Sequence, residues 1–189
     1  KRLGEILKRV EKPGRYIGGE VNSVKKESEE KLAFAFPDLY EIGMSYLGMQ
    51  ILYNVVNKTE NLSCERVFAP AADMEKLMRD ERLPLFTLEN KTPLKEMDMV
   101  GFTLQYEMSF STILNMLELS EIPLYSSERE ESCPIIAAGG PCAFNPEPLA
   151  DFIDIFLIGD GEELLPDVMK LHLKCRKEGL TRDEFLEKA

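Results

Sequence analysis

Two glycine-rich turns are the parts of this sequence most suited to holding a ligand. The run Gly139-Gly140-Pro141-Cys142 places two glycines directly after an apolar segment, so no side chain separates the backbone from whatever packs there. This suits either a flat ligand that approaches closely or a plain tight turn. The run Gly159-Asp160-Gly161-Glu162-Glu163 precedes a long helical pattern. Its acidic residues already complement the helix dipole, which disfavours a phosphate and favours self-capping or bonds to neutral amides and hydroxyls.

A third turn, residues 37–43, follows another apolar segment. Pro37 fixes the exit from that segment, and Gly43 permits a tight entry into the next helix. Asp38 is placed to orient a neighbouring hydrogen-bond donor. Taken alone, this turn is what an ordinary strand-to-helix connection requires.

The elements that position these turns are short apolar runs that alternate with amphipathic segments. Five runs predict strands: Leu32–Phe36, Arg66–Ala69, Met99–Leu104, Pro134–Ala138 and Ile153–Ile158. The three around residues 34, 101 and 136 are apolar on both faces, as expected for strands buried in a parallel sheet.

Helical spacing of apolar residues predicts helices between the strands. Leu47, Ile51 and Val55 share one predicted face. Further stripes are formed by Met74, Leu77 and Met78, by Phe110, Ile113, Leu114 and Leu117, and by Leu164, Leu165, Val168, Leu171 and Cys175. The last stripe covers roughly residues 161–178 and ends at Gly179. Thr181 and Glu184 have the spacing of a capping box.

Alternating strands and helices indicate right-handed β-α-β crossovers. We predict a flavodoxin-like α/β fold, a three-layer sandwich with a mainly parallel five-stranded sheet. Ligands of such sheets lie beyond the carboxyl ends of the strands, which here means residues 37–45, 104–109, 139–148 and 159–162. Residues 1–30 are expected to form an amino-terminal helix and loop, 31–180 the α/β domain, and 181–189 the start of a linker or helix. Lys25–Lys31 is expected to be a solvated connection.

Charge and hydropathy exclude some partners. The chain has 23 basic and 34 acidic residues and a net charge of −11, which would repel both nucleic acid and an anionic membrane. No apolar run reaches the roughly 18 residues of a membrane span, and the first residues do not form a secretory signal. We therefore expect a cytoplasmic protein. Its four cysteines are widely scattered and are expected to be free thiols.

The turns are more informative in combination than one by one. The segment Ile136 to Pro141, the words Pro146-Glu147-Pro148, and the run Asp154 to Glu163 closely resemble the cobalamin-binding domains that precede radical S-adenosylmethionine (SAM) modules. In that family a strand ends in Gly-Gly-Pro-His and a later strand runs into Gly-Glu-Gly-Glu. Here Cys142 replaces the histidine and Asp160 replaces the first glutamate.

The resemblance extends to the first turn and to two further segments of the chain. Asp38, Tyr40 and Gly43 align with the cobalamin signature D-x-H-x-x-G, and the words around 13–20 and 101–107 look like a subfamily of B12-binding radical enzymes. It implies that Gly139 and Gly140 admit the nucleotide tail of cobalamin and that Thr103 and Gln105 hydrogen-bond it. The cofactor-binding set it implies is Asp38, Tyr40, Gly43, Thr103, Gln105, Gly139, Gly140, Cys142, Gly159 and Gly161.

Tyr40 breaks the family pattern, because related domains have a cobalt-binding histidine at this position. A phenol with an ordinary pKa near 10 is mostly neutral at pH 7 and is a poor cobalt ligand. Two possibilities follow. Cobalamin binds base-off with no protein ligand below the corrin and Tyr40 packed beneath it, or the domain has lost the cofactor and is a scaffold that docks a partner.

A radical SAM cluster needs a C-x-x-x-C-x-x-C loop, and the nearest cysteines, Cys133 and Cys142, are nine residues apart. The [4Fe–4S] cluster and S-adenosylmethionine are therefore expected only in a carboxy-terminal radical SAM module, the expected partner of this region. The whole protein is expected to be an enzyme with a substrate that the sequence does not reveal, whereas this chain alone is not. The only histidine, His172, has no second basic group beside it and is expected to be structural.

Overall fold

The strands form one parallel sheet. The computed structural model describes residues 2–189. Its strands are β1 (Glu30–Phe36), β2 (Leu62–Phe68), β3 (Met99–Thr103), β4 (Ile135–Gly139) and β5 (Ile155–Leu157). They lie in the order β2-β1-β3-β4-β5, and every neighbouring pair is parallel. The predicted α/β fold is confirmed, and this strand order is consistent with the flavodoxin-like type.

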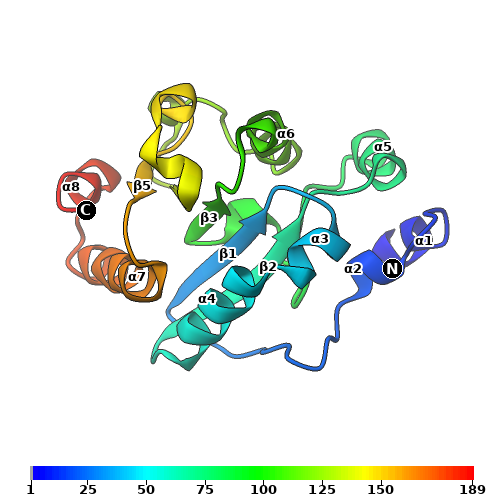
Figure 1. The fold of residues 1–189 in the computed structure, drawn as a ribbon, viewed down its shortest axis with the longest axis horizontal. Helices are drawn as coiled ribbons and strands as arrows, with labels where there is room; N and C mark the ends of the chain where they lie inside the picture. The colour runs from blue at the N-terminus through cyan, green and yellow to red at the C-terminus, as the bar shows by residue number, and fades with distance from the viewer. Residues whose placement is uncertain (1) are drawn as a thin grey trace.

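Helices cover both faces of the sheet (Figure 1). Helices α4 (Leu47–Lys58) and α7 (Gly161–Lys177) lie on one face, and α5 (Ala72–Glu81) and α6 (Phe110–Leu119) lie on the other. The shorter helices are α1 (Arg2–Leu7), α2 (Gly14–Ile17), α3 (Tyr40–Ser45) and α8 (Arg182–Leu186). Single 3-10 turns η1 to η5 occupy Leu94–Glu96, Glu107–Ser109, Ser126–Glu128, Pro141–Phe144 and Glu147–Leu149.

Side-chain alternation along the strands builds two cores. In β1, Leu32, Phe34 and Phe36 face α4 and α7, whereas Ala33 and Ala35 face α5 and α6. All five are buried, as predicted for a strand covered on both sides. The sheet thus places every β-to-α turn at one edge.

All five predicted strands differ from the structure by small changes of boundary, and the changes are largest in β2 and β5. β2 starts at Leu62, four residues before the predicted start at 66, because the polar residues Ser63 and Glu65 are buried within it. Glu65 accepts hydrogen bonds from the Thr87 hydroxyl and from Asn90, which satisfies its carboxylate. β5 has only three residues, Ile155–Leu157, fewer than the predicted Ile153–Ile158.

The prediction that Lys25–Lys31 is a solvated connection is wrong at its end. Glu30 is the first residue of β1 and is fully buried. Its Oε1 lies 2.5 Å from Nδ1 of His172 on α7, and Arg176 forms an ion pair with Oε2 at 3.2 Å. Burial raises the pKa of Glu30, and His172 opposes that shift. His172 therefore helps to attach α7 to the start of the sheet, in agreement with the structural role expected for it.

The predicted buried face of the 47–58 helix is also wrong. Leu47 is 70% exposed and Ile51 is 37% exposed, so this stripe faces solvent. The buried residues of α4 are Met49, Tyr53 and Val56. The sequence of α4 is apolar on more than one side, so its spacing alone does not select the face.

The carboxy-terminal helices follow their predicted signals. Thr181 and Glu184 form a capping box at the start of α8, and Gly179 has a φ of 73° after the end of α7. Phe185 of α8 is 1% exposed and packs on the α4–α7 side.

A buried ionic cluster fixes the start of β5. Both carboxylate oxygens of Asp154 are fully used: Oδ1 accepts from Arg129 Nη1 at 2.8 Å and from Ser126, and Oδ2 accepts from the Ile136 amide at 2.6 Å and from Arg182. The side chains of Asp154 and Arg129 are 0% exposed, and that of Arg182 is 6% exposed. This cluster joins β4, β5 and α8.

Candidate functional site

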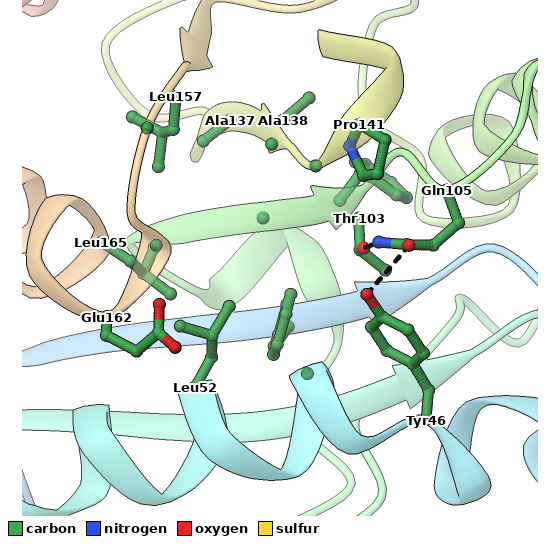
Figure 2. Close-up of a pocket in the computed structure, with 18 residues that line it drawn as sticks. Tyr46, Leu52, Thr103, Gln105, Ala137, Ala138, Pro141, Leu157, Glu162 and Leu165 are labelled. Carbon is green, nitrogen blue, oxygen red and sulfur yellow. Dashed lines mark hydrogen bonds between the residues drawn. The ribbon is translucent and has the colours of Figure 1, made fainter.

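A cavity of about 220 Å³ lies between the sheet and helices α4 and α7 (Figure 2). It reaches the ends of β3, β4 and β5, the edge at which ligands of such sheets bind. Its lining residues are Phe34, Tyr46, Gly48, Leu52, Gly101, Phe102, Thr103, Gln105, Ala137, Ala138, Gly139, Gly140, Pro141, Leu157, Gly159, Gly161, Glu162 and Leu165.

The strand register explains why this face is hollow at one end only. Leu32, Met99 and Ile135 are aligned neighbours on β1, β3 and β4, and these large side chains fill the core. Two residues further along, the aligned neighbours are Phe34, Gly101 and Ala137. Gly101 and Ala137 contribute little or no side-chain volume.

The next set of aligned residues, two positions further along the strands, also includes a glycine. Thr103 of β3 is aligned with Gly139 of β4, which is aligned with Leu157 of β5. The small residues of β3 and β4 therefore form a floor, with Leu52 of α4 and Leu165 of α7 at its sides (Figure 2). A flat apolar group is the kind of ligand that such a space accepts.

The backbone conformation and close contacts at position 140 require glycine. Its φ is 115°, and a Cβ added there would lie 2.9 Å from the Leu104 carbonyl oxygen and 3.2 Å from Gln105 Nε2. The turn after β4 thus packs directly on the loop after β3, which only glycine allows.

We predict that Gly140→Ala destabilises the fold by about 1–3 kcal/mol, because alanine meets both backbone strain and a steric clash. Denaturant unfolding measures this change. Gly179→Ala is the matched control: its φ is also positive, at 73°, but an added Cβ meets nothing within 4 Å. Gly179→Ala should lower the free energy of unfolding by only about 1 kcal/mol, from backbone strain alone. Equal losses in both variants would show that the close approach of Gly140 is unimportant.

Polar groups gather at the end of the cavity nearest the strand tips. Tyr46 donates from its hydroxyl to Gln105 Oε1 at 2.9 Å, and Gln105 Nε2 donates to the Thr103 hydroxyl. Figure 2 shows Tyr46 reaching from the start of α4 to Gln105 on the opposite side. Glu162 is the only charged residue in the lining, so the cavity offers an anionic ligand no countercharge.

The cavity brings together six of the ten residues that the sequence singled out. These are Thr103, Gln105, Gly139, Gly140, Gly159 and Gly161. The other four, Asp38, Tyr40, Gly43 and Cys142, lie outside its lining.

Asp38 remains at the strand tips and orients a donor from another loop. Its Oδ1 accepts from the Leu39 amide at 2.7 Å, and its Oδ2 accepts from the Tyr106 hydroxyl at 2.6 Å. The Asp38 hydrogen bond raises the pKa of Tyr106. Asp38 therefore joins the loops that follow β1 and β3.

Tyr40 is directed towards the amino-terminal segment. Its ring packs edge-on against Phe68, with 5.4 Å between centroids, and its hydroxyl donates to Glu20 at 3.2 Å. Burial, with the Glu20 carboxylate, raises the pKa of Tyr40, so its phenol is neutral at pH 7. Gly43 serves the same packing, since a Cβ there would lie 2.3 Å from the Phe68 ring.

Cys142 sits in η4, where its amide donates to the Leu104 carbonyl at 3.0 Å. Burial and the Glu107 carboxylate raise the pKa of its thiol, which disfavours the reactive thiolate. All four cysteines are free thiols, as expected.

Sequence reasoning missed lining residues that strand register and the approach of α4 bring to the cavity. Tyr46, Leu52, Gly101, Ala137 and Leu157 line the cavity but were not selected. A usable signal existed for two of them: Gly101 is a glycine inside an otherwise larger-residue strand, and Ala137 begins the run of small residues from 137 to 140.

Comparison with known proteins identifies the family. The family described as "Radical SAM proteins, N-terminal" matches residues 48–189, about three quarters of the chain. This chain belongs to that family. A radical SAM N-terminal region therefore contains the sheet from β2 onwards and all cavity-lining residues except Phe34 and Tyr46.

One curated relative of this radical SAM N-terminal region is "Uncharacterized protein MJ0966" of Methanocaldococcus jannaschii. It is 25% identical over 134 residues, which cover 70% of this chain and 24% of the relative. The chain thus spans about a quarter of the length of the relative. No solved structure matches the chain.

Residues 2–189 lack two kinds of feature. None of the helices there combines the length and apolar character needed to cross a bilayer. No group of three or more His, Cys, Asp or Glu side chains in that range is placed to hold a metal ion.

Proposed function

We propose that this radical SAM N-terminal domain binds cobalamin, with the nucleotide tail of the cofactor in the cavity between the sheet and helices α4 and α7. The corrin ring would lie over the turns that follow β1, β3, β4 and β5. The domain would present the cofactor to a catalytic radical SAM module elsewhere in the same protein. Family membership supports the radical SAM part of this proposal, and the cavity supports the cofactor.

The single observation that carries the proposal is the small-residue floor of the cavity. Gly101 on β3 and Ala137 and Gly139 on β4 lie beyond Met99 and Ile135, the large side chains that fill the core at the start of these strands. A benzimidazole is flat and apolar, and it suits a space bounded by this floor and by Leu52 and Leu165. The ribose next to it carries hydroxyls that suit Thr103 and Gln105.

The charge of the lining separates cobalamin from other ligands of flavodoxin-like folds. A flavin mononucleotide carries a dianionic terminal phosphate that needs several donors, yet the only charged side chain in the lining is Glu162. The nucleotide tail of cobalamin carries a phosphodiester with a single negative charge, and its corrin is edged by neutral amides, which donate to carboxylates and carbonyls. A lining whose charged side chain is Glu162 is compatible with such amides and disfavours a dianionic terminal phosphate more than a phosphodiester.

Exposed apolar side chains occur in the segments that follow four of the strands. The segments after β1, β3, β4 and β5 contain Ile42, Leu47, Tyr106, Met108, Phe144 and Ile158, which are 40–86% exposed. Exposed apolar side chains that form a contiguous patch are expected to be covered in the working protein. The corrin and the radical module together would cover these side chains.

The cobalt would receive no imidazole from this chain. Tyr40 is turned towards Glu20 and Phe68, and His172 is held by Glu30 at the opposite edge of the sheet. His172 is eleven positions after Gly161 on α7, which is about 16 Å along the helix. We therefore propose base-off binding without a lower protein ligand.

Bound cobalamin would supply a cobalt centre able to carry a methyl group or to take part in a radical rearrangement. The residues of this chain would hold and orient it: the glycine turns allow close approach, the cavity walls exclude water from the tail, and Gln105 donates a hydrogen bond. The [4Fe–4S] cluster, S-adenosylmethionine and the substrate would belong to the radical module. We propose a cytoplasmic location for the whole enzyme.

One observation favours the alternative, a scaffold that has lost the cofactor. The polar groups Tyr46, Gln105 and Thr103 satisfy one another across the cavity. In a scaffold, this bridge would be a permanent part of the core, and the exposed apolar side chains would only dock a partner.

Mixing with hydroxocobalamin tests the proposal. After desalting, the purified domain should retain about one cobalamin per chain and show a base-off absorption spectrum. Flavin mononucleotide, treated in the same way, should be removed by desalting. A colourless protein after exposure to hydroxocobalamin would overturn cofactor binding and favour the scaffold.

A further inference from the structure

The end of the cavity nearest the strand tips is crossed by one chain of hydrogen bonds. Tyr46 donates to Gln105 Oε1 at 2.9 Å, and Gln105 Nε2 donates to Thr103. This bridge joins the start of α4 to the loop after β3, at the end of the cavity nearest the strand tips (Figure 2). A ligand that enters from this edge meets the bridge first.

The Tyr46 ring is packed on two sides. A Cβ on Gly48 would lie 2.8 Å from the Tyr46 ring, so glycine provides the space that the ring occupies. On its other side, the ring is tilted against Phe36 with 5.4 Å between centroids. The hydroxyl is attached to the opposite wall through Gln105 alone.

The backbone at Tyr46 has the features of a hinge. Tyr46 ends α3 and begins α4 with extended dihedral angles, φ −81° and ψ 113°. It provides no side-chain cap for α4, and the Gln50 amide reaches its carbonyl only at 3.4 Å. Few residues absorb the change in direction between the helices, which is typical of a hinge position.

The bridge is also chemically suited to exchange its partners. A phenol hydroxyl and a primary amide each donate and accept, so both can transfer their hydrogen bonds to a hydroxyl or amide of an incoming ligand. The exchange leaves no group unsatisfied, which keeps its cost low.

We propose that Tyr46 and Gln105 form a latch that must open at the α3–α4 junction before a ligand enters the cavity, after which Gln105 bonds to the ligand. The latch rests on the proposed function for the identity of the ligand. It goes further by naming the residue pair that controls the rate of entry.

The variant Tyr46→Phe tests the latch because it keeps the ring and removes the hydroxyl. Tyr125→Phe is its control: Tyr125 is 47% exposed and packs on Phe152, away from the lining of the cavity. Amide hydrogen exchange needs no ligand. In Tyr46→Phe, exchange should rise about two- to tenfold in peptides that cover 46–53 and 103–107, the effect expected from losing one hydrogen bond. Tyr125→Phe should leave these peptides unchanged.

Stopped-flow binding supplies the second measurement. Cobalamin should associate with Tyr46→Phe about two- to tenfold faster than with the wild type. If the wild type fails to bind cobalamin, the proposed function falls, and 5,6-dimethylbenzimidazole alone then serves as the probe of entry. The latch is overturned if Tyr46→Phe leaves amide exchange in residues 46–53 and 103–107 unchanged. It is also overturned if Tyr46→Phe leaves the association rate of the bound compound, cobalamin or 5,6-dimethylbenzimidazole, unchanged.

Discussion

Ala137→Leu is expected to weaken cobalamin binding at least about 100-fold, the equivalent of about 3 kcal/mol. Ala137 is at the centre of the cavity floor, between Gly101 on β3 and Ile155 on β5. A leucine there would occupy the space that the proposed nucleotide tail needs. Because it fills a cavity, it should change the free energy of unfolding by less than about 1 kcal/mol. Equilibrium binding followed by absorbance measures the effect.

Ala150→Leu is the matched control for this variant. Ala150 is exposed, follows η5 and is outside the cavity lining, so the same substitution should leave binding unchanged. Full cobalamin affinity in Ala137→Leu, with an intact fold, would mean that the cofactor does not use the cavity.

Asp154→Ala is expected to destabilise the domain by about 3–5 kcal/mol, a large part of the stability of a typical domain. The substitution leaves the buried guanidinium of Arg129 and the nearly buried one of Arg182 without their carboxylate. Burial already lowers the pKa of Arg129, and Asp154 opposes that shift. The loss should be visible in urea unfolding as a lower midpoint with an unchanged slope.

Asp167→Ala provides the comparison for this second variant. Asp167 also pairs with a cation, Lys170, but the side chains of both are more than half exposed. Removing it should cost no more than about 0.5 kcal/mol. A loss below about 1 kcal/mol in Asp154→Ala would mean that the buried cluster behaves like a surface pair.

The fold was largely predictable because strands covered on both faces have a distinct composition. Leu32–Phe36 is apolar throughout, Met99–Leu104 has Thr103 as its one polar side chain, and glycine or proline directly follows four of the five runs. The structure retains these runs as β1 and β3 with small changes of boundary. The buried polar residues escaped this reasoning: Glu30, Glu65 and Arg66 look like solvated charges in sequence.

Arg66 illustrates why the burial of such residues cannot be predicted from sequence. It is fully buried, bonds to Glu89 at 2.8 Å, and lies over the Tyr53 ring at 4.3 Å. Its partners are 23 and 13 positions away, and only the fold brings them together. A charge is tolerated in a core when such partners exist, and no local pattern records them.

The candidate site was predictable in its turns but not in its floor. The glycines at 139, 140, 159 and 161 stand out locally and do line the cavity. Gly101, Ala137 and Tyr46 become neighbours through strand register and through the approach of α4, which local spacing does not determine. Motif alignment also gave Tyr40 the place of a cobalt ligand, but its side chain is directed towards Glu20.

Titration calorimetry with cobalamin and with cobinamide, the corrin without its nucleotide tail, tests the central claim most directly. The proposal predicts that the domain binds cobalamin at least about 100-fold more tightly than cobinamide, and that Ala137→Leu removes most of this difference. Equal affinities for the two compounds, or no binding of either, would contradict a tail-binding cavity between the sheet and helices α4 and α7.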